Sequence, residues 1–358
     1  MYKSVLGVFY LKILYGINTI GSGHINRSSV VINQLQKDGH HVDCIFSGPN
    51  PPNYALKIAN RYTQVHGYRM KFIGQNPDPI MTFWENFKKA RSILKSLFKS
   101  FRITLNQDYD AIISDFELST CLAGFFLRKP VIIVDHQHSL IHPGALRAPG
   151  KFSDIFNALI AMGMSNPYFK HIFALDLVNQ PIRRFKETLF PLIWKPEMIN
   201  LSVSVEDHYC VYLPYIPINK ICKVFSEFPE TNFHVYGFDM DKIYGNIHLK
   251  PTSRYGFLED MASSKGVISH TGFSITWEIM LLKKPFYTIP LKHHYEQRTN
   301  AYRLSKKNLA FVGDDLSIFH LKRFIDQCEQ DSFRNKGDIK ILEPNTLTKC
   351  IYKEIVKA

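Results

Sequence analysis

Two rounds of alternation between strand-like and helix-like segments constrain the fold of this chain more than any other feature of its sequence. Short runs rich in β-branched and aromatic residues, such as KILYGIN at residues 12–18, precede longer segments in which apolar residues recur at helical spacing. Such alternation is typical of parallel strands joined by right-handed helical crossovers. The sequence therefore predicts an α/β fold.

The first round predicts one doubly wound domain. Its candidate strands are residues 12–18, 41–48, 69–74, 110–116, 130–137 and 171–177. Its candidate helices are residues 26–38, 82–106 and 118–127. A less periodic stretch that contains prolines, residues 190–208, then reads as a connection.

The second round predicts another α/β domain. Its candidate strands are residues 209–214, 232–237, 247–251, 266–270, 285–290 and 310–313. Its candidate helices lie near residues 217–228, 254–263 and 273–283, and from about residue 295 onward. A length of 358 residues also favours two domains, at roughly 150 residues each. We therefore expect two Rossmann-like, doubly wound domains, residues 1–200 and 201–358, that face each other across a cleft, with a C-terminal helix that can pack back on the first domain.

The net charge narrows the choice of ligand. The chain has 44 Lys and Arg against 31 Asp and Glu, a formal charge of +13. Such a surface attracts phosphate in nucleic acid, anionic lipid or a phosphorylated substrate. The sequence has no aromatic-basic RNA motif and no helix-turn-helix signature, which argues against nucleic acid.

Cysteine spacing and hydropathy indicate the cellular compartment of the protein. The six cysteines form no CxxC pair and no His/Cys metal spacing, as in a reduced cytoplasmic protein. Lys12 interrupts the apolar N-terminus, and no small-residue cleavage site follows it. No run approaches the roughly 20 apolar residues of a membrane-spanning helix. We expect a cytoplasmic protein.

The loop after the first strand is the first candidate site. In NTIGSGHINRSSVVINQL, a Gly-x-Gly loop of Gly21 and Gly23 leads into an amphipathic helix, whose free N–H groups would face a ligand. His24 at this junction could take a proton from an acceptor hydroxyl, and Asp115 at the end of a later strand could orient it. The alternatives are that His24 caps or packs the helix start and that Asp115 caps the next helix.

A third loop of the first domain is rich in histidine. VDHQHSLIHPG follows the strand near residue 134 and includes His136, Gln137 and His138. It lacks the carboxylate or cysteine pattern of a zinc site, so hydrogen bonding to an acceptor is the favoured interpretation.

The second domain suggests a nucleotide-sugar pocket. The strand at 266–270 ends in SHTGFS, and the following helix would direct its N–H groups and positive dipole end toward a phosphate. Glu278 could accept two hydrogen bonds from a ribose diol, and Gln297 and Asn300 lie on one face of a later helix. The alternatives are that Glu278 is a surface charge and that Gln297 is solvated.

Together these motifs resemble those of GT-B glycosyltransferases, in particular the MurG-like family 28 transferases. In the first loop, the resemblance rests on a small residue followed by Gly23 and His24, together with Arg27. In the second domain it rests on the pattern HTG...TWE...KKP...IP...YEQ..NA. The resemblance covers most of the chain. The resemblance is strongest to a branch of MurG-like proteins in which the tripeptide Asp-His-Gln (DHQ) follows a strand of the N-terminal domain. It implies a GT-B fold.

The resemblance also implies roles for individual residues. The acceptor side would consist of Gly21, Gly23, Arg27, His136, Gln137 and His138, with His24 as the base and Asp115 as its partner. The diphosphate would contact His270, Thr271, Gly272 and Ser274. Glu278 would contact the ribose, and Glu296, Gln297 and Asn300 would line the sugar. A His–Asp pair is similar to that of plant-type and macrolide-modifying GT-B enzymes.

Two departures qualify the resemblance. MurG-like enzymes open the second domain with a Gly-Gly-Ser loop, whereas this chain has VYLPYIP there, without glycine. The first loop, IGSGH, is also poorer in glycine, so the acceptor is expected to differ from that of MurG itself.

Residues 83–102 raise the question of a membrane. FWENFKKARSILKSLFKSFR has aromatic and aliphatic residues at helical spacing with Lys and Arg between them. Such a helix can lie on an anionic bilayer, or it can pack on the core with a basic solvent face.

The expected activity is inverting, metal-independent transfer of a sugar from a UDP-sugar to a hydroxyl of an envelope glycan or lipid-linked acceptor, with no cofactor. The protein would be cytoplasmic or peripheral on the inner face of the membrane. The alternatives are a nucleotide-sugar hydrolase or 2-epimerase on the same fold, and a basic nucleic-acid-binding protein.

Overall fold

The computed structural model describes residues 4–5, 8–20, 22–67, 72–73, 76–77, 79–150, 152–198, 200–330 and 339–357. The chain forms two compact units. Unit 1 comprises residues 1–145, 150–194 and 340–358, and unit 2 comprises residues 146–149 and 195–339. The domain boundary predicted from the sequence lies at residue 200, whereas the main segment of unit 2 begins at residue 195. The last 19 residues belong to unit 1.

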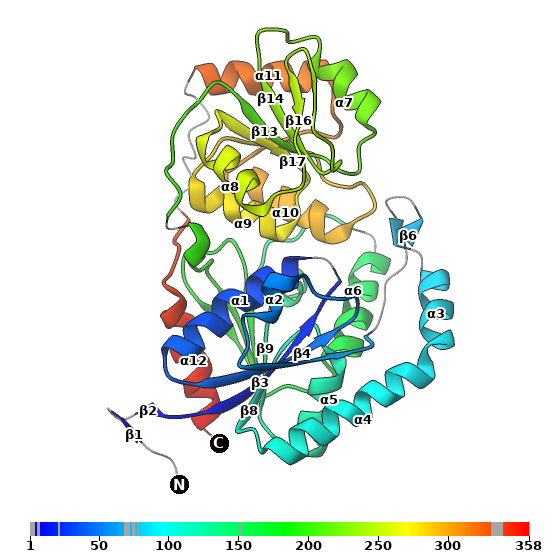
Figure 1. Ribbon diagram of the computed structural model, residues 1–358, viewed down its shortest axis with the longest axis vertical. Coiled ribbons are helices and arrows are strands. Elements are labelled where there is room, and N and C mark those ends of the chain that lie inside the picture. The colour runs from blue at the N-terminus through cyan, green and yellow to red at the C-terminus, as the bar shows by residue number, and fades with distance from the viewer. Residues whose placement is uncertain are drawn as a thin grey trace. The chain divides into compact units, whose positions relative to one another are not determined.

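Unit 1 is built on a sheet of eight described strands in the order β11-β12-β10-β9-β8-β3-β4-β5. Figure 1 labels β3, β4, β8 and β9 of this sheet. The strands are β3 (Lys12–Asn18), β4 (His41–Ser47), β5 (Arg61–Val65), β8 (Ala111–Asp115), β9 (Val131–Asp135), β10 (His171–Leu175), β11 (Ile182–Arg184) and β12 (Glu187–Phe190). Neighbouring strands are parallel except for β11 and β12. The predicted parallel sheet is confirmed.

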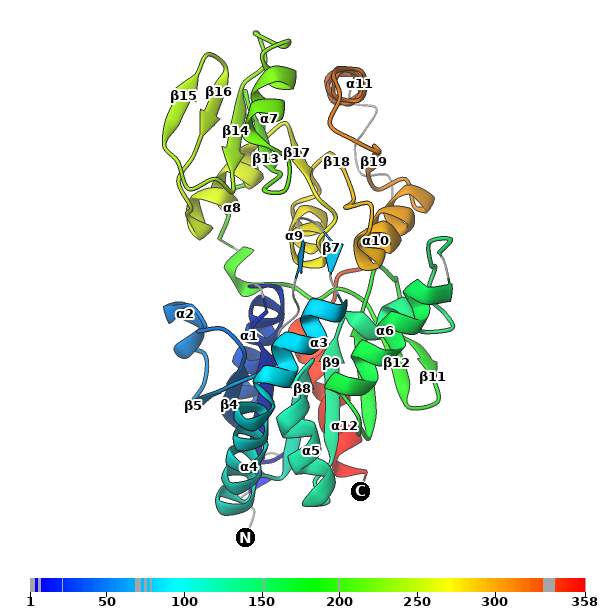
Figure 2. The same ribbon diagram turned by 90° about the vertical axis from the view of Figure 1, so that its right-hand side faces the viewer.

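Helices cover both faces of this sheet. They are α1 (Ser22–Lys37), α2 (Asn53–Leu56), α3 (Pro79–Lys88), α4 (Ala90–Gln107), α5 (Leu118–Phe126), the short η1 (Gln137–Leu140), α6 (Phe152–Ser165) and α12 (Pro344–Val356). Helices α1 and α12 lie on one face, and α4 and α5 lie on the other (Figures 1 and 2). The single helix predicted for 82–106 is two helices, because the chain turns at Lys89.

Two short antiparallel ladders lie outside the main sheets. They are β1 (Ser4–Val5) with β2 (Val8–Phe9), and β6 (Phe72–Ile73) with β7 (Asn76–Pro77). The strand predicted at 69–74 therefore does not join the main sheet through its described residues, 72–73. Its other residues lie outside the described part of the chain.

Specific side chains fix α12 and α5 on unit 1. Thr348 of α12 donates a hydrogen bond to Asp38 after α1, at 2.6 Å. A Cβ atom added to Gly16 of β3 would lie 2.1 Å from Thr120 Oγ1 of α5. The strand and the helix can therefore approach this closely only because residue 16 has no side chain.

Unit 2 is built on a sheet of seven described strands in the order β15-β16-β14-β13-β17-β18-β19. The strands are β13 (Tyr209–Tyr212), β14 (Phe233–Tyr236), β15 (Lys242–Tyr244), β16 (Ile247–Leu249), β17 (Gly266–Ser269), β18 (Phe286–Thr288) and β19 (Phe311–Val312). Its helices are η2 (Pro196–Met198), α7 (Ile218–Phe225), α8 (Arg254–Ser263), α9 (Phe273–Leu282), α10 (Tyr295–Lys306) and α11 (Ile318–Glu329). Only β15 and β16 pair in antiparallel fashion.

Each sheet has a point where the strand order reverses. In unit 1 the chain moves outward from β3 to β4 and β5, and then returns to place β8 on the other side of β3. In unit 2 the same reversal separates β13 from β17. Ligands of open α/β sheets bind outside the carboxyl ends of the strands at such points. The loops after β3, β8 and β17 therefore define the candidate site in each unit.

Among the helices in the described part of the chain, none combines the length and the apolar character that crossing a bilayer requires.

Candidate functional site

In unit 1, three side chains from the first turns of α1 converge on one carboxylate at the end of β8. His24 Nδ1 lies 2.8 Å from Asp115 Oδ1, so the predicted His–Asp pair is formed. Arg27 donates to the same carboxylate from Nε at 2.9 Å and from Nη2 at 2.5 Å. Ser28 donates to Oδ2 at 3.1 Å. Positions i, i+3 and i+4 of a helix share a face, which is why these three residues meet one partner.

The turn after β8 holds Asp115 in place. Phe116 adopts a left-handed backbone conformation, with φ of 58°, and its carbonyl oxygen accepts a hydrogen bond from Asn18 Nδ2 at 3.2 Å. Its ring stacks on the imidazole of His24, with 5.7 Å between ring centroids. Glu117, not Asp115, caps α5, because its carboxylate accepts from the backbone N–H groups of Ser119 and Thr120. Asp115 is therefore available to His24 and Arg27.

The charge state of Asp115 follows from its surroundings. Burial alone would raise the pKa of Asp115, but Arg27 and His24 more than offset this effect and lower it. Burial likewise disfavours the Arg27 cation, yet Asp115 raises the pKa of Arg27 above its usual value. The pair is thus a buried carboxylate and a buried guanidinium, and both are ionised at neutral pH.

The arrangement favours one tautomer of His24. With Asp115 ionised, the proton of a neutral imidazole is most stable on Nδ1, where it points at Oδ1. Arg27 Nη2 is also 3.0 Å from Nδ1, but its hydrogen bond to Asp115 Oδ1 is shorter. In this tautomer Nε2 has a free lone pair and can accept a proton. The side chain of His24 is 12% exposed, which is enough for contact with a ligand.

Two residues of the DHQ loop act on Arg27: the charge of Asp135 helps to raise the pKa of Arg27, and Gln137 lies beside it. Gln137 Oε1 lies 3.5 Å from Arg27 Nη2. His136 is buried, and its Nδ1 lies 2.8 Å from the carbonyl oxygen of Leu175. His138 is also buried and pairs with Asp135 at 2.7 Å, which raises the pKa of His138 despite the opposing effect of burial. Gly23 lies in the first turn of α1, and Gly21 lies outside the described residues.

In unit 2, His270 follows β17 and is the best placed of the predicted diphosphate residues. Its Nδ1 lies 2.7 Å from the carbonyl oxygen of Ile289 and donates to it, so Nε2 of the neutral ring has no proton. Nε2 is buried without a hydrogen-bond partner. Burial lowers the pKa of His270, although the bond to Ile289 opposes this. An anion that needs a donor at Nε2 would therefore favour protonation of the ring.

The next residues start α9. Gly272 is the N-cap of this ten-residue helix and has no side chain with which to cap it. Thr271 is fully buried, and its hydroxyl pairs with that of Thr288 at 2.8 Å. Ser274 lies in the first turn and is partly buried. The backbone here, rather than the Thr271 hydroxyl, is the group that could bind a phosphate.

Glu278 lies one turn further along α9 in a buried ion-pair network. Its Oε1 accepts from Lys195 Nζ at 2.6 Å and from Arg254 Nη2 at 2.7 Å, and its Oε2 accepts from Arg254 Nη1 at 3.1 Å. Burial opposes ionisation, but the two cations lower the pKa of Glu278. Its side chain is 2% exposed, so a ribose hydroxyl could reach it only if Arg254 gave up a bond.

The residues that were predicted to line the sugar lie at the start of α10. Gln297 Oε1 accepts from the backbone N–H of Leu291 at 3.0 Å, and Asn300 Nδ2 donates to the carbonyl oxygen of Thr271 at 3.2 Å. Both side chains are buried, whereas Glu296 is partly exposed. Gln297 and Asn300 thus tie the start of α10 to the ends of β18 and β17.

The sequence analysis missed several members of these clusters. Ser28 carries a recognisable signal, because it lies four residues after His24 on the same helical face. Lys195 stands alone between apolar residues in LIWKPE, and such an isolated cation signals a buried partner. Arg254 and Glu117 carry no comparable local signal.

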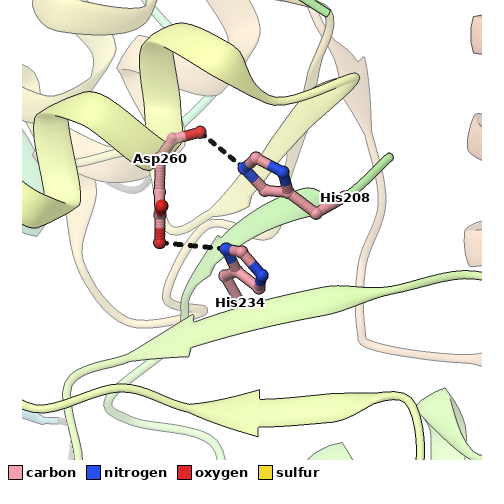
Figure 3. Close-up of side chains that lie close together, drawn as sticks. All are labelled: His208, His234 and Asp260. Carbon is pink, nitrogen blue, oxygen red and sulfur yellow. Dashed lines mark hydrogen bonds and ion pairs between the residues drawn. The ribbon is translucent and has the colours of Figure 1, made fainter. Parts of the chain in front are cut away.

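One group of side chains in the described part of the chain has the composition of a metal site. It consists of His208, His234 and Asp260, whose ligand atoms lie within 4.8 Å of one another (Figure 3). The carboxylate of Asp260 already accepts from Lys250 at 2.7 Å and from Tyr236 at 2.6 Å. A metal ion would have to displace the ammonium group. His208 precedes β13, whereas the candidate site follows the strands, so this group belongs to the opposite edge of the sheet.

Comparisons with known proteins place this geometry in context. The model of glycosyl transferase family 1 matches residues 11–328. No curated protein matches the sequence. Solved structures are similar over nearly the whole chain at low identity.

Three of these structures illustrate the likeness. The glycotransferase of kitacinnamycin is 13% identical with a TM-score of 0.62, and the alignment covers 97% of this chain and 95% of that one. Phytolacca americana UGT2 complexed with UDP-2fluoro-glucose and pterostilbene is 12% identical with a TM-score of 0.61, covering 97% and 94%. Spinosyn rhamnosyltransferase SpnG complexed with thymidine diphosphate is 13% identical with a TM-score of 0.59, covering 97% and 96%. These likenesses show the fold, which is GT-B.

Proposed function

Because the chain belongs to glycosyl transferase family 1, we propose that it transfers a sugar from a UDP-sugar to a hydroxyl group, with inversion at the anomeric carbon and without a metal ion. The observation that carries this proposal is the 2.8 Å contact between His24 Nδ1 and Asp115 Oδ1 at the point of strand reversal in unit 1. A histidine that is oriented by a carboxylate and keeps one imidazole nitrogen available can act as a general base.

The proposed reaction is a single displacement. His24 Nε2 takes the proton of the acceptor hydroxyl as its oxygen bonds to the anomeric carbon. The bond from that carbon to the phosphate oxygen breaks at the same time, and the electron pair leaves with the nucleoside diphosphate. Asp115 stabilises the imidazolium that forms, and Arg27 keeps Asp115 ionised throughout. Attack from the face opposite the leaving group inverts the anomeric carbon.

The leaving diphosphate is proposed to bind at the start of α9. The positive end of the α9 dipole, directly after Gly272, offers partial charge to an anion. His270 Nε2 would add a charge-assisted hydrogen bond once the ring is protonated. These groups could supply the stabilisation that a metal ion gives in other transferases, so we propose that no metal is needed.

The residues of the proposed donor site differ in burial, and we propose that the partly exposed ones contact the donor and the buried ones hold the loops. Ser274 and Glu296 are partly exposed and would contact the donor directly. Gln297 and Asn300 are buried and would hold the loops after β18 and β17 in position. Glu278 would contact the ribose after Arg254 releases one of its bonds. Thymidine diphosphate and UDP-2fluoro-glucose in two similar structures support a pyrimidine nucleotide.

The acceptor is proposed to be an envelope glycan or a lipid-linked molecule. The motif likeness to MurG-like family 28 transferases supports this choice, and the aglycone in the spinosyn rhamnosyltransferase structure represents the alternative of a free small molecule. On the acceptor side, Gln137 is the residue of the DHQ loop best placed to contact a substrate, since it is partly exposed beside Arg27.

Helices α3 and α4 support a site of action at the inner face of an anionic membrane. Residues 79–107 contain six Lys and Arg and one Glu. Helix α4 turns small residues inward, with Ser96, Ser100 and Thr104 buried, while Phe98 is 69% exposed. A helix that presents its large apolar residues and its cations to solvent suits the interface of an anionic bilayer.

A transfer assay tests the proposal. Purified protein is incubated with UDP-, TDP- and GDP-linked hexoses and with a lipid extract or a panel of phenolic and sugar hydroxyl acceptors. We expect product only with an acceptor present, UDP-sugars as the best donors, inverted anomeric configuration by NMR, and no loss of rate with EDTA. Retained configuration would contradict the single displacement, and loss of rate with EDTA would contradict metal independence.

The same assay separates the alternatives. Release of nucleotide and free sugar without any acceptor would indicate a hydrolase. Conversion of the UDP-sugar to its 2-epimer would indicate an epimerase. Family membership already favours an enzyme over the nucleic-acid-binding alternative.

A further inference from the structure

A groove in unit 1 lies beside α4, along β3, β4 and β5. It has a volume of about 560 Å³, which is within the range of small-molecule sites, about 300–1,000 Å³. Its floor and walls are partly apolar. The apolar and aromatic lining residues are Leu14, Cys44, Tyr62, Phe98, Ile103 and Tyr109.

The packing of α4 explains why the groove stays open. Ser96, Ser100 and Thr104 form the buried stripe of the helix, and Ser100 pairs with Ser119 of α5 at 2.7 Å. The helix therefore packs closely on α5 through small side chains. Its larger residues Phe98 and Ile103 border the groove instead of filling it. Figure 2 shows α4 on the β4–β5 side of the sheet.

The charge around the groove is positive. Four cations line it, Arg61, Lys95, Lys99 and Arg102. The only carboxylate among the lining residues is Asp43, which accepts from Tyr109 at 2.7 Å and pairs with His41 at 2.9 Å. Asp43 therefore already has two hydrogen-bond partners. The groove combines an apolar floor with an anion-attracting rim.

The groove is separate from the His24–Asp115 cluster. Asp115 is paired in register with Ile17 of β3, whereas the groove begins at Leu14, three residues earlier. At about 3.3 Å per residue, these positions lie about 10 Å apart along the strand. A ligand in the groove would therefore not occupy the proposed catalytic position.

We propose that this groove binds a single anionic phospholipid, with the phosphate against the cations of α4 and β5 and an acyl chain along the apolar floor. Charge complementarity selects an anion, and the aromatic and aliphatic lining selects an amphiphile over a free phosphate. Burial of methylene groups is favourable, so an acyl chain adds affinity that phosphate alone lacks. The inference concerns binding only and does not depend on the proposed transfer reaction.

Calorimetry with monomeric lipids tests this inference. Dioctanoyl phosphatidylglycerol, dioctanoyl phosphatidylcholine and inorganic phosphate are titrated separately into the full chain. We expect one molecule of the glycerol lipid per chain, bound at least tenfold more tightly than the choline lipid or phosphate. Equal affinity for both lipids, equal affinity for phosphate, or no binding would overturn the proposal.

Variants localise the binding. Lys95→Ser/Arg102→Ser removes two rim cations, and Ile103→Trp fills the floor, so each should weaken binding at least tenfold. Lys322→Ser/Arg323→Ser removes one Lys and one Arg from exposed positions of α11 and should leave binding unchanged. Equal losses in both double variants would indicate a general charge effect and contradict a defined site.

A further variant separates the groove from docking on a membrane surface. Leu94 is exposed on α4 but does not line the groove. Leu94→Ser should therefore leave binding of the monomeric lipid unchanged while reducing sedimentation with anionic vesicles. Loss of monomer binding in this variant would place the lipid on the outer face of α4 and overturn the assignment to the groove.

Discussion

At the scale of single residues, the hydrogen bonds that Asp115 accepts from several partners determine the orientation and the tautomer of His24. Asp115 Oδ2 accepts from Arg27 and Ser28, and Oδ1 accepts from Arg27 and faces His24 Nδ1. The guanidinium keeps the carboxylate ionised but also offsets part of its charge. In the proposed reaction, Asp115 would therefore act mainly by fixing the orientation and tautomer of His24.

Replacing His24 tests this role. We expect His24→Ala to lower kcat by about 10²–10⁴-fold, as for loss of a general base, with little change in UDP affinity. The matched control is His41→Ala, since His41 forms another His–Asp pair in unit 1, at 2.9 Å and away from the carboxyl ends of the strands. Transfer by His24→Ala at the wild-type rate would remove it as the base.

The pH dependence of donor binding tests His270. Burial lowers the pKa of His270 in the free protein, and a diphosphate at Nε2 should raise it. A group whose pKa rises on binding takes up a proton, so UDP affinity should fall as pH increases from the free to the bound pKa. We expect a steeper pH slope of the UDP Kd for wild type than for His270→Gln. Titration of the nucleotide phosphate is common to both proteins, and identical slopes would contradict the role of His270.

At the scale of elements, sequence patterns located most strands because parallel strands are buried on both faces. The first strand was predicted at residues 12–18 and is β3, and a helix predicted near residues 254–263 is α8. The edge strand β5 was missed because Arg61–Val65 is mostly exposed and polar. The break between α3 and α4 was missed because apolar spacing continues across Lys89.

The cap of α5 offers a stability test at this scale. Glu117 is buried and accepts from the N–H and hydroxyl groups of both Ser119 and Thr120. Glu117→Ala should reduce the free energy of unfolding by about 1–3 kcal/mol, because buried donors lose their acceptor. Glu117→Gln keeps one acceptor oxygen and should lose less. Urea unfolding followed by circular dichroism measures both, and equal stability of wild type and Glu117→Ala would contradict the capping role.

At the scale of the whole molecule, the sequence predicted which loops carry the candidate site better than it predicted their internal contacts. Loops after parallel strands share one edge of a sheet, so the meeting of His24 with Asp115, 91 residues apart, followed from topology. The contact of Lys195 with Glu278 did not, because Lys195 lies in the aperiodic connection at residues 190–208, which the strand and helix pattern does not place. Motifs spread over both units predicted a GT-B glycosyltransferase, and the matching family is one of glycosyltransferases, but it is glycosyl transferase family 1 and not the MurG-like family 28 that the motifs resemble.

The proposed transfer requires that unit 2 bind a nucleoside diphosphate at the start of α9. A thermal-shift series with UDP, TDP, GDP, ADP and their sugars tests it most directly, because a ligand at 100 times its Kd stabilises the native state by about 2.7 kcal/mol. We predict that UDP and UDP-sugars raise the melting temperature of wild type, that His270→Gln responds less, and that His293→Gln, changed at an exposed position, responds as wild type does. A melting temperature that no nucleotide changes would contradict the account.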